Sequence, residues 1–286
     1  MELLAPAKVN LFLEIIGKRA DGYHEIDTIL QTINLYDKIS ISNRDQEIVF
    51  KCNWLRPEDI VPDEEDNIAY RAAILLKEQL NEKKGAKIVI KKNIPVGAGL
   101  GGGSSDAVCV IRGLLKLWHR KIERKDLEKL TLKLGVDVPF FLHQGCCFAK
   151  GIGEKLTLVR TSWSKKPLCL VLVNPGFPVP TKMAYRLLPD RFTDRHVIDK
   201  IKSPLTETVL KSIAFNRFEE VVFRHYPGLK EIKQSLIKVG AELALMSGSG
   251  STIFGIFNTE KDAMSAYREI KRMIPEEYKI ILSETI

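Results

Sequence analysis

Alternation of apolar and polar residues marks the first part of the chain. Residues 9–15, 38–42 and 47–50 each follow a period of two, which predicts β-strands with one buried face. Residues 19–24 lie between the first two strands and contain Asp-Gly, a dipeptide typical of tight turns. A further strand is predicted over residues 87–90. This part of the chain therefore favours a series of short, antiparallel-looking strands.

Helical spacing appears between and after these strands. Asp66 and Asn67 open a segment whose apolar residues recur on one face, so a helix is predicted from there to about residue 80. Residues 107–119 and 124–134 show two more helical patterns. Gly135 follows the second of these and is expected to end it as a C-terminal cap.

The second half of the chain combines both patterns. The predicted order is a strand at 168–173, several helices, strands at 243–246 and 252–257 joined by a turn, a helix at 260–273 and a strand at 279–282. This is the order of a ferredoxin-like split βαβ sandwich. Residues 162–167 form a polar connector. We therefore expect an α+β protein with two lobes, one over residues 1–162 and one over residues 163–286.

Composition and charge narrow the class of protein. Of the 286 residues, 45% are hydrophobic and 28% are charged, as in globular proteins. No stretch approaches the roughly 18 apolar residues of a membrane span. The N-terminus also lacks a basic segment followed by an apolar one, so we expect a cytoplasmic protein. The net charge of +8 fits nucleic acid, phosphorylated ligands or a solvated basic surface, and the scattered basic residues favour the last.

Cysteine usage indicates neither a disulfide framework nor a metal site. The five cysteines and five histidines show no metal-ligand spacing. Cys109 falls in an apolar helical pattern and Cys169 in an apolar strand pattern. Buried thiols are therefore expected for all five cysteines.

A glycine-dense segment precedes the helix predicted at 107–119. Glycines occupy positions 97, 99, 101, 102 and 103. Glycine lacks Cβ, so its backbone N–H can lie close to a ligand. The unpaired N–H groups and positive dipole end of the following helix attract anions. We expect these glycines to lie outside regular elements and to bind phosphate. Ser104 or Ser105 would cap the helix or contact the phosphate, and Asp106 would be an ordinary first-turn residue.

Two better-known phosphate motifs do not fit this segment. Residues 97–102 match GxGxxG formally, but the preceding short strands do not begin a βαβ unit. Glu123 lies about 20 positions beyond, as in a dinucleotide-dependent oxidoreductase, but follows a helix rather than a strand. No Gly-Lys-Ser/Thr closes the loop, so a Walker A motif is excluded.

Two further segments are ambiguous by themselves. Residues 247–251, Ser-Gly-Ser-Gly-Ser, join two predicted strands and fit either a flexible hairpin turn or part of the same phosphate site. Lys8 and Asn10 share one face of the first strand because they are two positions apart. A lysine at the start of an apolar strand is, however, usually a solvated edge residue.

Three segments in this order resemble the three motifs of the GHMP kinase superfamily: residues 6–10, 95–106 and 246–251. Residues 19–25 (Arg-Ala-Asp-Gly-Tyr-His-Glu) and 137–141 (Asp-Val-Pro-Phe-Phe) are similar to the branch that phosphorylates 4-diphosphocytidyl-2-C-methyl-D-erythritol in the non-mevalonate isoprenoid pathway. The Asp-Gly-Tyr-His-Glu block discriminates, because the superfamily at large lacks it. The resemblance implies a two-lobed fold with an N-terminal ribosomal-protein-S5-like lobe and a C-terminal ferredoxin-like α/β sandwich lobe.

The resemblance also implies the reaction, which is transfer of the ATP γ-phosphoryl group to the 2-hydroxyl of the methylerythritol unit. It assigns catalysis to Lys8 and Asp137. Phosphoryl transfer depends on positioning and charge stabilisation, and a carboxylate can accept the hydroxyl proton. Asp137 would be the general base, and Lys8 would orient the hydroxyl and stabilise charge. An aspartate between Gly135 and Pro139 is also a typical cap or turn residue, which leaves a structural role open.

The acceptor end is assigned in the same way. Tyr23 and His24 would hold the cytosine, with Tyr185 as the second aromatic that sandwiches the base. Thr181 and Asn10 would contact other parts of the substrate. The third motif would contribute Ser247, Gly248 and Ser249. The alternatives are a turn position for Tyr23 and His24 and a core position for Tyr185.

ATP is the implied cosubstrate, with Mg2+ as its counterion. The residues that would surround its phosphates are Pro95, Val96, Gly97, Ala98, Gly99, Leu100, Gly101, Gly102, Gly103, Ser104 and Ser105. Asn67 and Lys92 match positions near the adenine or ribose in relatives. The partner is then a small molecule, a cytidine diphosphate-linked methylerythritol, bound by a monomer or weak homodimer without nucleic acid, membrane or a permanent metal site.

Other interpretations remain. Another GHMP kinase, of the homoserine or mevalonate type, would use a different acceptor, and residues 21–25 argue against it. A nucleic-acid-binding module would show a basic stripe with exposed aromatics, which the sequence lacks. Residues 191–202 match no motif and are expected to form a variable surface segment.

Overall fold

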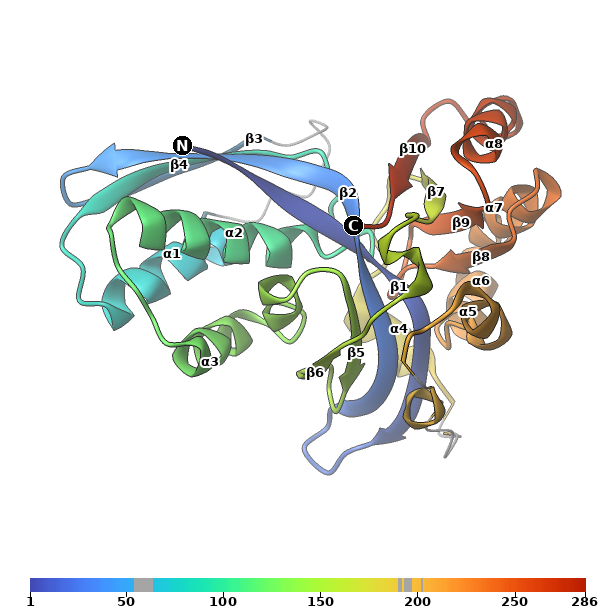
Figure 1. The fold of residues 1–286 in the computed structure, drawn as a ribbon, viewed down its shortest axis with the longest axis horizontal. Helices are drawn as coiled ribbons and strands as arrows, with labels where there is room; N and C mark the ends of the chain where they lie inside the picture. The colour runs from blue at the N-terminus through green and yellow to red at the C-terminus, as the bar shows by residue number, and fades with distance from the viewer. Residues whose placement is uncertain (54–63, 190–191, 193–196, 202) are drawn as a thin grey trace. The chain divides into compact units, whose positions relative to one another are not determined.

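The computed structural model describes residues 1–53, 64–189, 192, 197–201 and 203–286 (Figure 1). Its strands are β1 (Glu2–Lys18), β2 (His24–Arg44), β3 (Ile48–Asn53), β4 (Gly85–Lys91), β5 (Cys146–Lys150), β6 (Lys155–Leu158), β7 (Cys169–Asn174), β8 (Leu243–Met246), β9 (Ile253–Phe257) and β10 (Lys279–Glu284). Its α-helices are α1 (Ile68–Gln79), α2 (Gly102–Leu117), α3 (Arg124–Leu134), α4 (Thr181–Leu187), α5 (Glu207–Ile213), α6 (Glu219–His225), α7 (Pro227–Lys238) and α8 (Glu260–Met273). Short 3-10 helices are η1 (Glu64–Asp66), η2 (Pro139–Leu142), η3 (Ser162–Ser164) and η4 (Ile198–Lys200). Part of the predicted variable segment at 191–202 lies outside the described residues.

The first two strands are much longer than the sequence pattern predicts. β1 pairs with β2 around the predicted Asp-Gly turn, where Gly22 has φ +85°. A positive φ of this size is easily reached only by glycine, which confirms the turn. His24 therefore begins a strand and does not lie in a loop.

The first compact unit comprises Met1–Ala7, Leu35–Val96 and Gly101–His143. In this unit β4 pairs in parallel with β3 and in antiparallel fashion with the C-terminal half of β2. The helices α1, α2 and α3 pack together, and Figure 1 shows them on one side of these strands. Gly113 allows close approach of α2 to β2, because a Cβ there would lie 2.4 Å from Ile41 Cδ1.

The second compact unit comprises Lys8–Asn34, Gly97–Leu100 and Gln144–Ile286. It contains an antiparallel sheet in the order β10-β7-β9-β8. The helices α7 and α8 pack against this sheet (Figure 1) and bury their apolar faces on it. The order of strand, helices, hairpin, helix and strand is as predicted, and the ferredoxin-like sandwich is confirmed. In the same unit, β5 and β6 extend the N-terminal half of β2.

These units differ from the division predicted at residue 162. β1 and β2 each run through both units, because a single strand supplies hydrogen bonds to different neighbours at its two ends. Gly97–Leu100 belongs to the second unit although the residues on either side belong to the first. The division into family lobes at 1–162 and 163–286 stays a prediction.

Among the described residues, no helix has both the length and the apolar character that a membrane span needs. All five cysteines are free thiols. Cys109, Cys146 and Cys147 are buried as predicted, whereas Cys52 and Cys169 are half-buried, so the prediction is wrong for these two. Burial raises the pKa of the Cys109 and Cys147 thiols to about 12, which disfavours the reactive thiolate.

Candidate functional site

The glycine-dense segment ends earlier than predicted. α2 begins at Gly102, and Gly101 precedes it in the left-handed conformation with φ +69°. Gly102, Gly103, Ser104 and Ser105 therefore belong to the helix. The prediction that the glycines lie outside regular elements is wrong for two of them. Their N–H groups are nevertheless the ones that a helix N-terminus directs toward an anion.

Neither serine caps this helix. The N-cap is Gly101, which makes no side-chain capping bond, so the predicted capping role is wrong. Ser105 is buried, and its Oγ has no hydrogen-bond partner within the described part of the chain. Buried hydroxyl groups normally have a partner. This hydroxyl near a helix N-terminus therefore fits a contact to a phosphate oxygen or its metal, which stays a prediction.

The preceding four residues, Gly97–Leu100, contact two other predicted motifs inside the second unit. Ser247 Oγ donates to Gly99 O at 2.9 Å. A Cβ at Gly99, where φ is +78°, would lie 1.9 Å from Ser247 O, so only glycine fits there. Lys8 N donates to Leu100 O at 2.9 Å. The structure thus brings together β1, the middle of the glycine segment and the third motif.

Lys8 and Asn10 lie on one face of β1, as predicted. Lys8 Nζ donates to Asn10 Oδ1 at 2.6 Å, and Asn10 Nδ2 donates to Thr28 Oγ1 at 2.9 Å. Lys8 is only 3% exposed, so its interpretation as a solvated edge residue is wrong. A buried ammonium must be compensated by polar or charged groups. Asn10 N also donates to Ser247 Oγ at 3.4 Å, which joins this pair to the third motif.

The third motif is the turn between β8 and β9, as predicted. Asn216 Nδ2 donates to Met246 O at 2.6 Å and to Gly248 O at 2.8 Å. Ser249 Oγ and Thr181 Oγ1 lie 3.0 Å apart, so these two predicted substrate residues meet. The motif is therefore held by several side chains and is not a freely flexible turn. Sequence reasoning did not identify Asn216.

Two of the three residues predicted for the base, His24 and Tyr185, belong to an aromatic cluster in the second unit. His24 stacks on Tyr185, with ring centroids 4.6 Å apart and an interplanar angle of 17°. Phe218 contacts Tyr185 edge-on at 4.9 Å, and Phe192 contacts His24 at 5.9 Å. Tyr23 is 57% exposed. Tyr185 also packs against the core, as its alternative interpretation predicts, and its role at the base stays a prediction.

Asp137 lies in the first unit, in the turn between α3 and η2, where it is half-buried. Gly135 ends α3 as predicted. Val138 N donates to Gly135 O at 3.1 Å, and Arg112 Nη2 of α2 donates to Leu142 O at the end of η2 at 2.9 Å. These bonds fix the backbone on both sides of Asp137. Its predicted pairing with Lys8 joins residues of different units and stays a prediction.

Lys92 belongs to a buried ionic cluster in the first unit. Its Nζ donates to Asp106 Oδ2 at 2.7 Å and to Asp37 Oδ2, and all three side chains are at most 5% exposed. Asp37 Oδ1 also accepts from Ile94 N at 2.8 Å, and from Asn93 N. Asp106 is therefore not the ordinary first-turn residue expected, because it lies one turn further into α2 and forms a buried ion pair. Sequence reasoning missed Asp37.

The charges of this cluster suit its position. A Cβ at Gly102 would lie 3.2 Å from Lys92 Nζ, which places the cluster at the N-terminus of α2. One ammonium and two carboxylates sum to a negative charge, which the positive end of the helix dipole favours. Burial raises the pKa of the Asp106 carboxyl, and Lys92 opposes this shift. Burial lowers the pKa of Lys92, but the attraction of Asp106 and Asp37 outweighs it and leaves the pKa raised.

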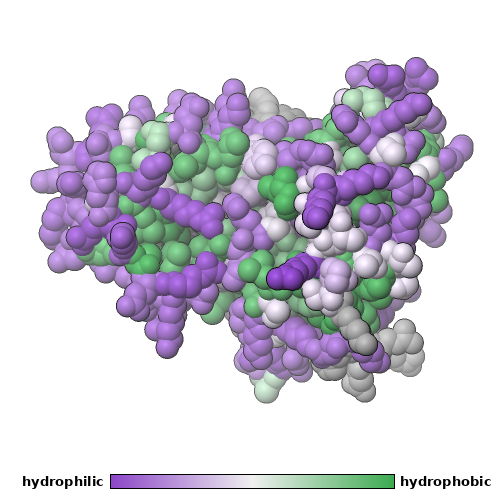
Figure 2. All heavy atoms as spheres, in the orientation of Figure 1, coloured by the Kyte–Doolittle hydropathy of each residue, from purple (hydrophilic) through white to green (hydrophobic). Residues whose placement is uncertain are grey.

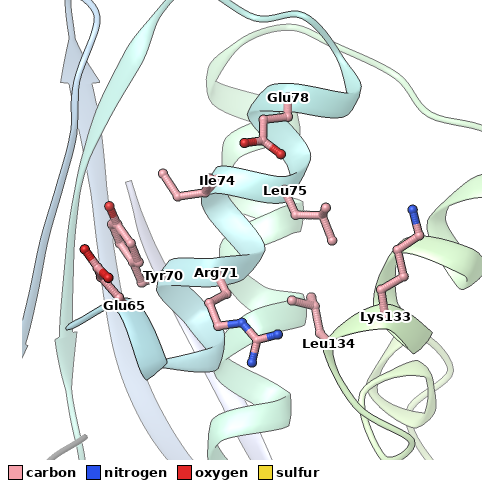
Figure 3. Close-up of a pocket in the computed structure, with 8 residues that line it drawn as sticks. All are labelled: Glu65, Tyr70, Arg71, Ile74, Leu75, Glu78, Lys133 and Leu134. Carbon is pink, nitrogen blue, oxygen red and sulfur yellow. The ribbon is translucent and has the colours of Figure 1, made fainter. Parts of the chain in front are cut away.

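A separate pocket of about 470 Å³ opens between α1 and α3 (Figure 3). It is lined by Glu65, Tyr70, Arg71, Ile74, Leu75, Glu78, Lys133 and Leu134. Figure 2 shows apolar surface gathered between these helices and hydrophilic surface over α3. None of the predicted site residues lines this pocket. Asn67 is instead the N-cap of α1, where its Oδ1 accepts from Ala69 N at 2.9 Å.

Comparison with known proteins finds two matching family models and a curated relative of full length. The sequence matches the family model of the GHMP kinases N terminal domain over residues 67–145 and that of the GHMP kinases C terminal region over residues 200–276. A 4-diphosphocytidyl-2-C-methyl-D-erythritol kinase of Clostridium tetani is 39% identical over 297 residues, which cover 100% of both chains.

Solved structures share the fold. A crystal structure of 4-(cytidine 5'-diphospho)-2C-methyl-D-erythritol kinase matches with a TM-score of 0.82 and 34% identity, and covers 100% of this chain and 99% of that one. A homoserine kinase from Cytophaga hutchinsonii matches with a TM-score of 0.77 at 18% identity, over 100% of this chain and 97% of that one. The second likeness shows the fold alone.

Proposed function

Because the chain belongs to the GHMP kinase family, within its branch of 4-diphosphocytidyl-2-C-methyl-D-erythritol kinases, we propose that it phosphorylates the 2-hydroxyl of that cytidylyl substrate with ATP. The products are the 2-phosphate and ADP, in the non-mevalonate isoprenoid pathway. The observation that carries this function is the 39% identity to the Clostridium tetani kinase across 100% of both chains. The likeness to homoserine kinase, at 18% identity, supports only the fold.

The proposed chemistry is an in-line displacement. The 2-hydroxyl oxygen forms a bond to the γ-phosphorus while the bond from that phosphorus to the β-phosphate oxygen breaks and ADP leaves. Asp137 accepts the hydroxyl proton, and Lys8 orients the hydroxyl and stabilises developing charge. The support for Lys8 is its burial beside Asn10, because a buried ammonium on a rigid strand is well suited to positioning.

The phosphates of ATP are proposed to lie on the glycine segment and the start of α2. Gly102 and Gly103 are the first two residues of the 16-residue helix α2. Backbone N–H groups at such a helix N-terminus favour an anion. The place of Lys92 near the adenine or ribose stays a prediction. Its ammonium is bonded to Asp37 and Asp106, and these bonds fix the start of the segment to the helix that follows it.

Magnesium that accompanies ATP completes the proposal, since it would neutralise charge on the β and γ oxygens. Ser105 Oγ fits such an ion or a phosphate oxygen, because it is buried without a partner in the described chain. The described residues contain no group of three or more His, Cys, Asp or Glu side chains that could hold a metal by themselves. The ion is therefore expected to bind together with the nucleotide.

The cytosine is proposed to bind at the aromatic cluster of His24 and Tyr185. In the structure the two rings stack on one another. A base sandwiched against that face of Tyr185 has to displace the His24 ring, which would then be placed to hydrogen-bond the base edge. The partner is a small molecule, and a cytoplasmic monomer or weak homodimer remains our expectation.

Acceptor profiling tests the function directly. We expect ADP release from magnesium-ATP with 4-diphosphocytidyl-2-C-methyl-D-erythritol, and none above the no-acceptor control with homoserine or mevalonate. Preferred turnover of homoserine or mevalonate would replace the proposed acceptor and favour the other GHMP kinases. Silence with every acceptor, from folded protein that binds ATP, would reject the proposed substrate.

Tyr185→Ala is expected to raise the KM for the cytidylyl substrate about 5- to 150-fold, because stacking of one base on an aromatic ring is worth about 1–3 kcal/mol. The KM for ATP should stay at the wild-type value. Steady-state kinetics with each substrate varied in turn measures both constants. Tyr185→Phe is the matched control and should retain wild-type KM, since it keeps the ring. An unchanged acceptor KM in Tyr185→Ala would remove this residue from the base site.

A further inference from the structure

The segment formed by residues 215–219, which leads into α6, contacts three parts of the proposed acceptor site within the second unit. No motif of the sequence identifies it. Its backbone pairs with β1, because Leu13 N donates to Phe215 O at 2.8 Å and Arg217 N donates to Leu13 O at 2.9 Å. The Arg217 guanidinium also pairs with Glu14, at 2.6 Å and 2.8 Å. The segment is therefore fixed to the strand that carries Lys8 and Asn10.

Asn216 joins this segment to the third motif. Its side chain is 1% exposed, and both N–H bonds of its amide are used, one on Met246 O at 2.6 Å and one on Gly248 O at 2.8 Å. Its Oδ1 accepts from Phe218 N at 2.9 Å. An asparagine amide offers two donors on one nitrogen, which here match two carbonyl groups two residues apart. Removal of the amide would leave both carbonyl groups without this donor.

Glu219 holds the same turn through the backbone N–H of Met246, whose C=O is bonded to Asn216. Its Oε1 accepts from Met246 N at 2.8 Å, and its Oε2 pairs with Lys233 of α7. The N–H and the C=O of Met246 are thus both bonded to residues of one segment. The backbone that enters the third motif is consequently fixed in direction as well as in position.

The same segment also supports the aromatic cluster. Phe218 packs edge-on against Tyr185 at 4.9 Å, and Tyr185 stacks on His24. On the other side, Ser247 of the third motif bonds to Gly99 O and to Asn10 N. A shift of residues 215–219 would therefore move the third motif and the base-binding rings together.

From these contacts we infer that Asn216 is a positioning residue for phosphoryl transfer, which holds the third motif in the geometry that the acceptor and the glycine segment require. This role rests on the proposed function. Asn216 touches neither substrate in this account, and it acts through Gly248 and Ser247. Misplacement of a catalytic arrangement by about 1 Å can lower the rate about 100-fold.

The test compares Asn216→Ala with Asn34→Ala. Asn34 is a matched control, because its amide also joins two backbone segments of the second unit: Oδ1 accepts from Glu284 N at 2.8 Å, and Nδ2 donates to Glu284 Oε1 at 3.1 Å. We expect kcat of Asn216→Ala to fall about 10- to 100-fold, with the KM for ATP within about threefold of wild type. Asn34→Ala should lose thermal stability and keep its kcat. Assays are run well below the melting temperature of each variant.

Hydrogen exchange supplies a readout that does not depend on turnover. In Asn216→Ala the backbone amides of residues 247–250 should exchange faster than in wild type, while those of β7 remain protected; Asn34→Ala should leave residues 247–250 unchanged. A wild-type kcat in Asn216→Ala, or unchanged exchange of residues 247–250, would overturn the role of Asn216. If wild-type protein does not turn over the cytidylyl acceptor, the proposed function fails, and the exchange of residues 247–250 still decides whether Asn216 holds the motif.

Discussion

Replacement of Asp137 by asparagine is expected to lower kcat for acceptor phosphorylation by about 10²- to 10⁴-fold, the usual contribution of a general base. Asparagine keeps the size and shape of the side chain but cannot accept the proton of the 2-hydroxyl. The backbone turn should persist, because the bond from Val138 N to Gly135 O and that from Arg112 to Leu142 O do not involve the carboxylate. ATP affinity, measured by calorimetry, should remain at the wild-type value.

Asp126→Asn is the matched control for this variant. Asp126 lies on α3 in the same unit, where it is exposed and pairs with Lys129 at 3.4 Å. Loss of such a surface pair should change kcat by no more than about twofold. Lys8→Ala, alone and combined with Asp137→Asn, tests whether the two residues act as one unit, in which case the double variant is scarcely slower than the slower single one. If Asp137→Asn binds ATP and retains wild-type kcat, Asp137 is not the base.

The largest expected effect on stability follows from Lys92→Met. This change leaves the buried carboxylates of Asp37 and Asp106 without their ammonium, and removal of one partner of a buried ion pair typically costs about 3–5 kcal/mol. Urea unfolding, followed by circular dichroism, measures the free energy of unfolding. Lys87→Met is the control, because Lys87 lies on β4, the strand that Lys92 directly follows, and is exposed. Addition of Asp106→Asn to Lys92→Met should restore part of the loss, since one uncompensated charge is then removed.

The pH dependence of the Lys92→Met variant has a definite sign. Burial raises the pKa of Asp106 in the folded chain. A carboxyl group whose pKa is higher in the folded than in the unfolded chain stabilises the fold at a pH below its pKa in the unfolded chain, about 3.9 for aspartate. This stabilisation is lost as the pH rises through the pKa that the group has in the folded chain. Removal of Lys92 raises that pKa further. The difference in free energy of unfolding between wild type and Lys92→Met should therefore shrink as the pH falls from about 8 toward 5. A deficit that is small, or that grows toward acid pH, would contradict this account of the cluster.

Periodic burial explains which elements are predictable from the sequence. The helix α8 buries Ala263, Ala266 and Ile270 on one face, and this spacing is visible in the sequence. Gly102 and Gly103 show where prediction from the local sequence fails. Their low helix propensity predicts a loop, but tight packing decides, because a Cβ at Gly102 would lie 3.0 Å from Ile94 Cγ2.

The site shows the same contrast between local and distant information. Lys8 and Asn10 share a face because of strand periodicity, which needs only two positions of separation. Asp37 lies 55 residues before Lys92, and the pairing of β2 with β4 is what brings them together. Asn216 lies 30 residues before Met246 and has no periodic sign of its function. Polar contacts of this kind depend on the tertiary arrangement and leave no local pattern.

The discontinuous second unit has a consequence for the folding of the chain during its synthesis on the ribosome. Lys8–Asn34 must pair with Gln144–Ile286, and nearly all of the first unit lies between them in the chain. All residues of the first unit have been translated by residue 143, whereas the N-terminal half of β2 pairs with a strand that is translated later. Contacts of such long sequence separation form slowly, because the loop-closure entropy is lost before the contacts are gained. We expect the apolar side chains of β1 and β2 to be exposed during this interval, so the nascent chain is a natural client for a chaperone until its C-terminal sheet is complete.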